Sequence, residues 1–453
     1  MMSRYAMLLV MLSLNSYSYH AVAESPTKSS HLDQAEAPDP NYVGPVFKPS
    51  FDFPPALPAA EPHPWEKISF KLNPELYMAA VLQYALEGQD RSRWAVEKNP
   101  VRKWYHAPWM GPGGKGREYI NGLTSERRSQ PKELGPNHTK CRQNWAVGFY
   151  NPLGGYTLGR FWAPIVSGTS QEPDYSALPF PPGTVVVKFL YTQADTTDLS
   201  SLSGAPTIQA RIIEDPNPDD DKCPADNING VPAKRIEATL RLLQVDIGVR
   251  DSSANDASGW VFGTFFYDGT QPGSDPWKKL RPVGLMWGND HALTDEMASN
   301  QEKPKEGIVL STFDFKRNFG RGGRMNGPVD NPNSSCLSCH MTAQKNPPGM
   351  TAPDGANWSI ARCWFRTLKP TEAFGMQPSE GECGEAKKGQ ASLDYSLQLS
   401  AGLRNYEIAL ANTNRGGIEI LGTKFFQSPL LSPDQTVKLN GLISAPISRE
   451  GDK

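Results

Sequence analysis

The sequence lacks the features that mark several large classes of protein. Its 46 basic and 48 acidic residues almost cancel, so it has no electrostatic footprint for nucleic acid. It has no apolar run long enough to span a bilayer, and it shows no internal repeat. Cysteine and histidine are scarce, at six and seven residues in 453. A short motif built from these two residue types therefore has a chance of only about one in a thousand of arising by accident.

One such motif is present, Cys336-Leu337-Ser338-Cys339-His340. Cys-x-x-Cys-His is the pattern of covalent c-type haem attachment, in which two thiols on one turn add to the two vinyl groups of a haem. The histidine that follows can then bind the iron as its proximal ligand. The alternative, a zinc site, needs a second Cys/His pair at short spacing, and none lies near. The sequence therefore predicts one covalent haem c on Cys336 and Cys339, with His340 as the metal ligand.

The first 23 residues have the pattern of a secretory signal peptide. Arg4 provides a positive charge, Tyr5 to Leu14 is apolar, and Ala21-Val22-Ala23 is a small-residue cleavage site. The apolar run is too short for a membrane span, and no cysteine follows the cleavage site, which argues against a lipoprotein anchor. We therefore expect a periplasmic protein of a Gram-negative bacterium. This agrees with c-type haem, which bacteria attach outside the cytoplasmic membrane.

The four cysteines outside the motif favour disulfides in such an oxidising compartment. Three pairings are possible. We favour Cys141–Cys223 with Cys363–Cys383, because each pair then falls within one region of the chain; buried free thiols are the alternative. The second bridge would close a short loop just after the haem motif and stiffen the surroundings of the site.

Composition and periodicity divide the mature chain into three parts. Residues 24–65 are rich in proline and poor in periodicity, which indicates a linker or a surface strap. Residues 66–345 form the expected β-rich haem domain, and residues 346–453 form a C-terminal extension packed on it. In the extension, residues 395–410 fit either a strand or a helix, and a capping box at Ser432 predicts a short helix to about residue 442.

The fold class predicted for the haem domain is mainly β with some α, built on an antiparallel sheet. A helix is expected from Asn73-Pro74, a cap followed by a first-position proline, to the stop at Gly88. Apolar residues then alternate with period two in successive stretches that no helical pattern separates. The expected strands are 145–150 and 156–162, joined as a hairpin through 151–155, and then 185–191, 243–249 and 260–267.

Four segments carry a resemblance to a known family. They are Trp104-Tyr105-His106, Phe180 to Lys188, Val249-Arg250-Asp251 and Gly259 to Gly263. In this order, with the haem motif last, they resemble the cytochrome P-460 and cytochrome c-prime-beta family over roughly Val101 to Ala343. The resemblance implies a β-sheet monohaem fold, thioether bonds at Cys336 and Cys339, and proximal ligation by His340.

The family resemblance also implies two kinds of chemistry. Members similar to P-460 carry a lysine bound covalently to the porphyrin and oxidise hydroxylamine, whereas c-prime-beta members have an apolar distal face and bind nitric oxide. Near Tyr150-Asn151-Pro152, where that lysine would be sought, this chain has Leu153. The departure argues against a lysine link and against hydroxylamine oxidation.

The sixth iron position decides what the haem can do, because a methionine ligand favours electron transfer and an open side permits ligand binding. Met350 and Met376 are candidate thioether ligands, although methionine more often fills gaps in a core. His106 and His291 are candidate ligands or proton relays, with a structural role as the alternative. We expect neither methionine to bind and His340 alone to hold the iron on the protein side.

Two further groups of side chains are candidates for the surroundings of the haem. The aromatic rings that could wall the distal face, or simply pack in the core, are Phe313, Phe315 and Phe319. The arginines that could pair with haem propionates, or lie in a flexible basic loop, are Arg317, Arg321 and Arg324.

These observations leave three function classes for a periplasmic monohaem c-type cytochrome. The first is a redox enzyme or small-ligand binder, with nitrogen oxide chemistry as one form. The second is an electron-transfer carrier for another periplasmic enzyme, and the third is a haem-based sensor or a structural haem protein. The expected partner is a periplasmic redox protein or a small-molecule ligand. Nucleic acid is not expected as a partner, and no membrane span is expected after removal of the signal peptide.

Overall fold

The computed structural model describes Asp33 and residues 35–413, apart from residues 60, 111–115, 216, 218–222, 224–226, 229–230, 310–319, 348, 376–382, 385 and 387. Several predictions fall outside the described residues: the signal peptide, the helix at Ser432, Met376, Arg317, Phe313, Phe315 and Phe319. Within the part of the chain that is described, none of the helices combines the length and the apolar character needed to cross a membrane.

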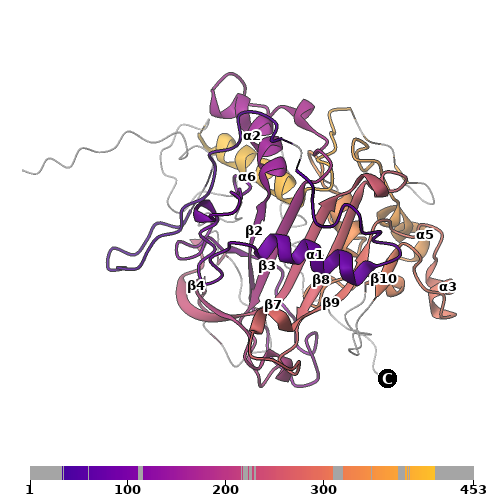
Figure 1. Cartoon of the computed structure of the whole chain (residues 1–453), viewed down its shortest axis with the longest axis horizontal. Helices are drawn as coiled ribbons and strands as arrows, with labels where there is room; N and C mark the ends of the chain where they lie inside the picture. Colours follow the sequence, from indigo (N-terminus) through magenta and orange to yellow (C-terminus); the bar gives the residue numbers. More distant parts are fainter. Residues whose placement is uncertain are drawn as a thin grey trace, which may run out of the picture.

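The fold is mainly β with some α, as the sequence predicted, and it centres on one antiparallel sheet (Figure 1). In spatial order its strands are β1 (Thr124–Ser125), β2 (Asn144–Tyr150), β3 (Val185–Thr192), β7 (Arg235–Arg250), β8 (Trp260–Tyr267), β9 (Leu280–Met286) and β10 (Gly307–Val309). Strand β4 (Thr207–Ile213) pairs with the first half of β7, and β5 (Asn227–Ile228) and β6 (Val231–Pro232) form a separate ribbon.

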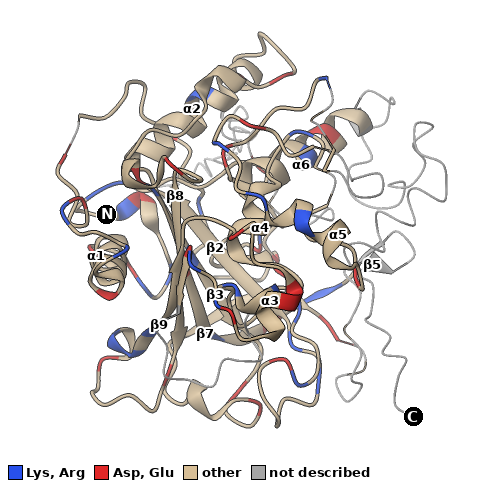
Figure 2. Ribbon diagram, turned by 90° about the vertical axis from the view of Figure 1, so that its right-hand side faces the viewer, with Lys and Arg blue, Asp and Glu red and all other residues tan. Residues whose placement is uncertain are grey.

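Helices lie on both sides of this sheet (Figure 2). Helix α1 (Pro74–Leu86) covers one face, while α4 (Cys336–Met341), α5 (Trp358–Ala361) and α6 (Leu397–Thr413) lie on the other side. Helices α2 (Pro152–Val166) and α3 (Asp295–Ser299) complete the described α-helices. We call the two sides of the sheet the α1 face and the α4 face.

The register of the strands assigns side chains to these faces, because successive residues of a strand point in opposite directions. The α1 face carries the paired residues Phe149, Val187, Ile247 and Gly263 across β2, β3, β7 and β8. The α4 face carries two ranks of paired residues across the same strands. The first rank is Tyr150, Val186, Gly248 and Phe262, and the second rank is Gly148, Lys188, Asp246 and Thr264.

Helix α1 confirms the helix predicted after Asn73. Pro74 occupies its first position, and Gly88, just beyond its end, has a φ of +71° that favours glycine. Met78 reaches the sheet at Gly263, where an added Cβ would lie 3.1 Å from the terminal carbon of Met78. Glycine in β8 therefore lets the helix pack closely on the α1 face.

The predicted hairpin is wrong, because residues 156–162 form part of helix α2 and not a strand. The side chain of Asn151 accepts a hydrogen bond from the backbone N–H of Gly154, and Pro152 stands at the first helical position. Leu158, Phe161 and Trp162 are buried on one side, which is the spacing of a helix. Asn-Pro is the same start signal that identified α1, so the local sequence favoured a helix over a turn.

Other elements differ from the predictions in extent. Strand β7 runs for 16 residues, well beyond 243–249, and β4 and β9 were not predicted. In β9, Pro282 and Gly284 interrupt the alternation of apolar residues that marks a strand. Residues 397–413 form helix α6, which decides between the strand and the helix left open for this region.

Both predicted disulfides are confirmed. Cys141 is joined to Cys223 with their Cα atoms 5.0 Å apart, and Cys363 is joined to Cys383 with Cα atoms 5.3 Å apart. The two cysteines of the motif are free thiols.

Candidate functional site

Helix α4 presents the three motif side chains on one side. Cys336, Cys339 and His340 are spaced i, i+3 and i+4, which places them on one face of a helix, and all three are partly exposed. The opposite side of α4 is buried and consists of Leu337, Ser338 and Met341. Two sulfur atoms and one imidazole are thus directed toward the same region, as haem attachment requires.

A capping box starts this six-residue helix. The Ser335 hydroxyl accepts a hydrogen bond from the Ser338 N–H, and the Ser338 hydroxyl accepts one from the Ser335 N–H. Ser335 Oγ also donates to Asn289 Oδ1 at 3.0 Å, and Asn289 Nδ2 donates to the Arg366 carbonyl at 2.7 Å. Because one and a half turns are not stable alone, these bonds fix where α4 lies beyond the end of β9.

The thiol of Cys336 points to the α4 face of the sheet. Its Sγ lies 3.9 Å from Thr264 Oγ1 on β8 and 3.6 Å from Met325 Sδ. Burial raises the pKa of Cys336 well above its usual range and raises the pKa of Cys339 to about 12. Both residues are therefore neutral thiols at physiological pH.

His340 is held in one tautomer by the backbone. Its Nδ1 lies 2.8 Å from the carbonyl oxygen of Tyr395, and burial lowers the pKa of His340 to about 4. The ring is therefore neutral, and because a carbonyl oxygen can only accept, Nδ1 carries the proton. Nε2 is left with its lone pair, which is the arrangement of a metal-binding histidine oriented by its second ring nitrogen. The ring packs on Phe262, with centroids 4.4 Å apart.

The sheet opposite these side chains is incompletely covered by the described part of the chain. Along β3, Val185 and Val187 on the α1 face are buried, whereas Val186 and Lys188 on the α4 face are partly exposed. This is unusual for an interior strand. Two free thiols, a neutral imidazole and an accessible patch of sheet together fit a c-type haem, with Cys336 and Cys339 as attachment points and His340 as the ligand.

The second rank of the α4 face is charged. Lys188 Nζ donates to Glu126 Oε2 at 2.9 Å. Burial lowers the pKa of Lys188, but the charges of Glu126, Asp246 and Asp330 outweigh burial and raise it, so the side chain is a cation. Burial, reinforced by the charge of Asp330, raises the pKa of Asp246 to about 7. A proton donor and acceptor for neutral pH therefore lies two contacts from Cys336, through Thr264.

Lys188 also changes what the departure at Leu153 means. Leu153 lies in the first turn of α2, whereas Lys188 lies in β3 on the α4 face, beside Asp246. The structure thus brings a lysine to the sheet surface that faces the motif. The absence of lysine at position 153 therefore does not decide whether this site has one.

The histidine and methionine candidates in the described residues lie in other environments. His106 is fully buried, its ring centroid 6.3 Å from that of Phe149 on the α1 face, and its Nδ1 accepts a hydrogen bond from the Ser50 N–H at 3.0 Å. Burial lowers the pKa of His106 well below its usual range, which makes it a neutral core residue. His291 is exposed, and Met350 is 56% exposed. His106 thus lies on the side of the sheet opposite the motif, which agrees with the structural alternative.

Arg321 and Arg324 bind the protein itself. Arg324 is buried and donates to the carbonyl oxygens of Asn289 at 2.8 Å, Asp290 at 3.0 Å, Leu293 at 2.7 Å and Arg321 at 3.0 Å. Arg321 donates to both carboxylate oxygens of Asp295, at 2.9 and 2.5 Å. These donors therefore already have acceptors in the fold, and pairing of the two arginines with haem propionates stays an alternative that nothing in the structure tests.

Sequence reasoning missed several residues of the site. Tyr395 contributes only its backbone carbonyl, which no side-chain pattern can signal. Met325, 11 residues before Cys336, is buried with its sulfur against that thiol. The strand around Lys188 was predicted, and its alternation places Lys188 and Val186 on one face. The sequence does not indicate which helix covers that face.

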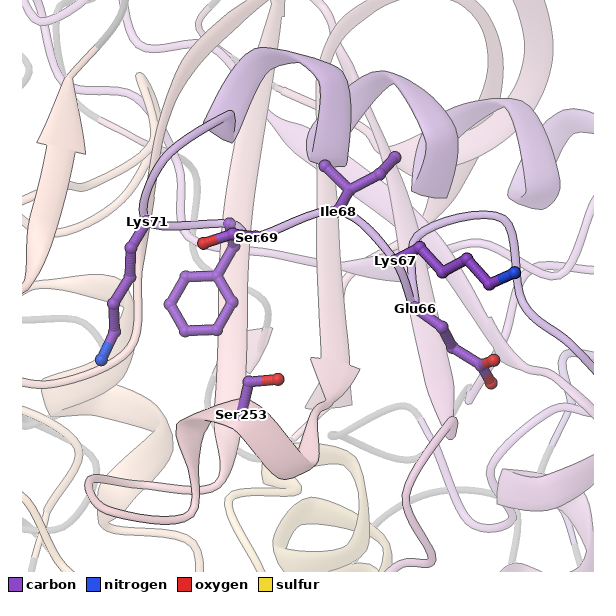
Figure 3. Close-up of a pocket in the computed structure, with 7 residues that line it drawn as sticks. Glu66, Lys67, Ile68, Ser69, Lys71 and Ser253 are labelled. Atoms are coloured by element: carbon purple, nitrogen blue, oxygen red, sulfur yellow. The ribbon is translucent and has the colours of Figure 1, made fainter.

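A separate hollow lies beside α1 (Figure 3). Glu66 to Lys71 and Ser253 line it. The Lys71 ammonium lies over the rings of Phe70 and Trp287, at 5.7 and 5.5 Å from their centroids. None of these residues belongs to the haem motif or to its surroundings, so the hollow is not part of the candidate site.

In the described ranges, no group of three or more His, Cys, Asp or Glu side chains is arranged to hold a metal ion. No family model, curated protein or solved structure matches the chain. The family resemblance therefore stays a prediction, and a functional conclusion depends on the geometry around α4.

Proposed function

We propose that this chain is a periplasmic monohaem c-type cytochrome, with the haem joined to Cys336 and Cys339 and its iron bound by His340. One observation carries the proposal: the three motif side chains share one side of α4, and the Tyr395 carbonyl leaves Nε2 of His340 as the free ring nitrogen. The two disulfides support an oxidising compartment. When bound, haem supplies an iron that exchanges one electron and binds small ligands.

Covalent attachment is the direct test. The haem of the purified protein should stay with the polypeptide in acid acetone, and Cys336→Ala/Cys339→Ala should lose it. Cys363→Ala/Cys383→Ala removes the same number of sulfur atoms outside the motif and should keep the haem. Release of haem from the wild-type protein into acid acetone would show that the proposal is wrong.

Within this class, we favour redox chemistry or small-ligand binding at an open iron site over simple electron transfer. Asp246, through Thr264, places an ionisable group with a pKa of about 7 near Cys336, which suits a reaction that takes up or releases protons. Lys188, which is ion-paired with Glu126, adds N–H donors on the same face, which suits a small ligand that carries lone pairs. Nitrogen oxides are ligands of this kind, and a periplasmic redox protein is the expected electron partner.

An electron carrier is the second candidate, and one observation favours it. Met325 is 1% exposed and its Sδ lies 3.6 Å from Cys336 Sγ, so a buried thioether is available near the attached haem. A methionine ligand would make the iron six-coordinate and low-spin. Met350, which is exposed, provides the matched control.

The visible spectra of two variants separate these candidates. For an open site, Met325→Leu and Met350→Leu should both leave the oxidised spectrum unchanged, and the wild-type protein should bind nitric oxide or cyanide readily. Loss of a methionine-to-iron charge-transfer band in Met325→Leu alone would establish the electron carrier and reject the open site.

A further inference from the structure

The backbone that orients His340 has an uncommon conformation. Asp394 and Tyr395 have φ values of +47° and +63°, two consecutive residues in the left-handed region without a glycine. Side chains disfavour this region, and such strain persists only where the surroundings enforce it. The result is a carbonyl of Tyr395 that faces Nδ1 of His340 at 2.8 Å.

The carboxyl group of Asp394 ties this segment to strand β8 and to the loop that precedes β3. Asp394 is fully buried, and each of its oxygens accepts one hydrogen bond. Oδ1 accepts from the indole N–H of Trp260 on β8 at 2.8 Å, and Oδ2 accepts from the backbone N–H of Phe180, which precedes β3, at 2.6 Å. These are residues of two segments that carried the family resemblance, and they converge on one side chain.

Neighbouring bonds hold the two ends of the same segment. The Leu393 N–H donates to the carbonyl of Ala343, just after α4, at 2.9 Å. The Tyr395 hydroxyl donates to the Leu368 carbonyl at 2.7 Å. Asp394 is the member of this set whose side chain is fully buried and accepts two hydrogen bonds, so its removal frees the strained backbone to relax.

We infer that Asp394 is a positioning residue for His340. Its two hydrogen bonds keep residues 394 and 395 in the conformation that aims the Tyr395 carbonyl at Nδ1, and thereby set how strongly His340 donates electrons to the iron. This inference rests on the proposed function of His340. A histidine that loses the acceptor on its second nitrogen becomes a weaker electron donor, which stabilises the reduced iron.

The test measures the iron–histidine bond and not the fold. Asp394→Asn keeps the shape but replaces one acceptor oxygen by a donor that faces another donor. We expect it to retain covalent haem, to shift the midpoint potential to a more positive value and to lower the iron–histidine stretching frequency of the reduced protein. Asp268→Asn, which removes another fully buried carboxylate, should change neither quantity, and neither should Tyr395→Phe, which keeps the carbonyl.

A milder variant covers the case in which Asp394→Asn does not fold. Trp260→Phe removes one of the two bonds to Asp394 and should shift both quantities in the same direction by a smaller amount. Unchanged potential and frequency in a haem-loaded Asp394→Asn or Trp260→Phe protein would overturn the inference while leaving the proposed function intact. A wild-type protein without covalent haem would overturn the proposed function first.

Discussion

At the residue scale, Asp394 shows how burial changes the protonation of a side chain. Burial raises the pKa of this carboxyl group to about 7. The hydrogen bond from Trp260, the charge of Arg250 and the hydrogen bond from Phe180 act in the opposite direction without cancelling burial. In an unfolded chain an aspartic acid has a pKa of about 4. Between these values the folded protein holds the proton more tightly than the unfolded chain.

The sign of the resulting pH dependence follows from linkage. Because the native state binds more protons between about pH 4 and pH 7, the free energy of unfolding should fall as the pH rises through this window and level off above it. Asp246, whose pKa is also raised to about 7, contributes in the same direction. Urea denaturation of the holoprotein from pH 4.5 to 8 measures the slope. Asp394→Asn should be less steep than the wild type, and parallel curves would contradict this account.

At the element scale, helix starts in this protein depend on single side chains. Asn151 serves α2 and the sheet together: its Oδ1 accepts from the N–H groups of Gly154 and Val185 at 3.2 and 3.1 Å, and its Nδ2 donates to the Gly183 carbonyl at 2.9 Å. The residue thus joins the start of α2 to the start of β3. A hairpin turn at Asn151 would not need this cap, because only the first N–H groups of a helix lack acceptors within their own element.

Loss of this cap should destabilise the protein measurably. We expect Asn151→Ala to lower the free energy of unfolding by about 2 kcal/mol, the upper end for an N-cap, because further hydrogen bonds are lost with it. Asn151→Asp keeps the acceptor for Gly154 and Val185 and should cost less. Equilibrium denaturation in urea measures the free energy of unfolding of both variants. Equal stability of the wild type and Asn151→Ala would show that the cap does not stabilise the protein.

At the scale of the whole molecule, the site is assembled from segments far apart in the chain. Strands β3, β7 and β8 supply the α4 face, α4 supplies the motif, and the segment before α6 supplies the carbonyl that faces His340. The disulfides close loops of very different length around this assembly, with a sequence separation of 82 for Cys141–Cys223 and of 20 for Cys363–Cys383.

Loop length predicts which disulfide stabilises the molecule more. Chain-entropy estimates give about 4.5 kcal/mol for the 82-residue separation and about 3.3 kcal/mol for the 20-residue separation. Cys141→Ala/Cys223→Ala should therefore lower the free energy of unfolding more than Cys363→Ala/Cys383→Ala. Denaturation of the two double variants at one pH gives the comparison, and the reverse order would indicate that native-state strain outweighs chain entropy.

Local patterns predicted the elements whose signals lie within a few residues. Helix α1 has its start and stop signals within 16 residues, β3 and β8 have clear alternation, and the haem motif occupies five consecutive positions. The same kind of signal was present at Asn151-Pro152 but competed with the two glycines that follow, which suggested a turn. Burial of Phe161 and Trp162 decided in favour of the helix.

The sequence by itself determined the mainly β fold and the two disulfides, and it predicts the chemistry of the motif, because each depends on residue type and short-range order. Tertiary structure alone decided which groups surround the motif. In the folded protein His106 lies on the α1 face, and the guanidinium of Arg324 donates hydrogen bonds to four backbone carbonyls. Tertiary structure also brought Lys188, Asp246 and the Tyr395 carbonyl toward α4. Such neighbours depend on which faces pack together across hundreds of residues, and the buried polar groups then take whatever partners that packing provides.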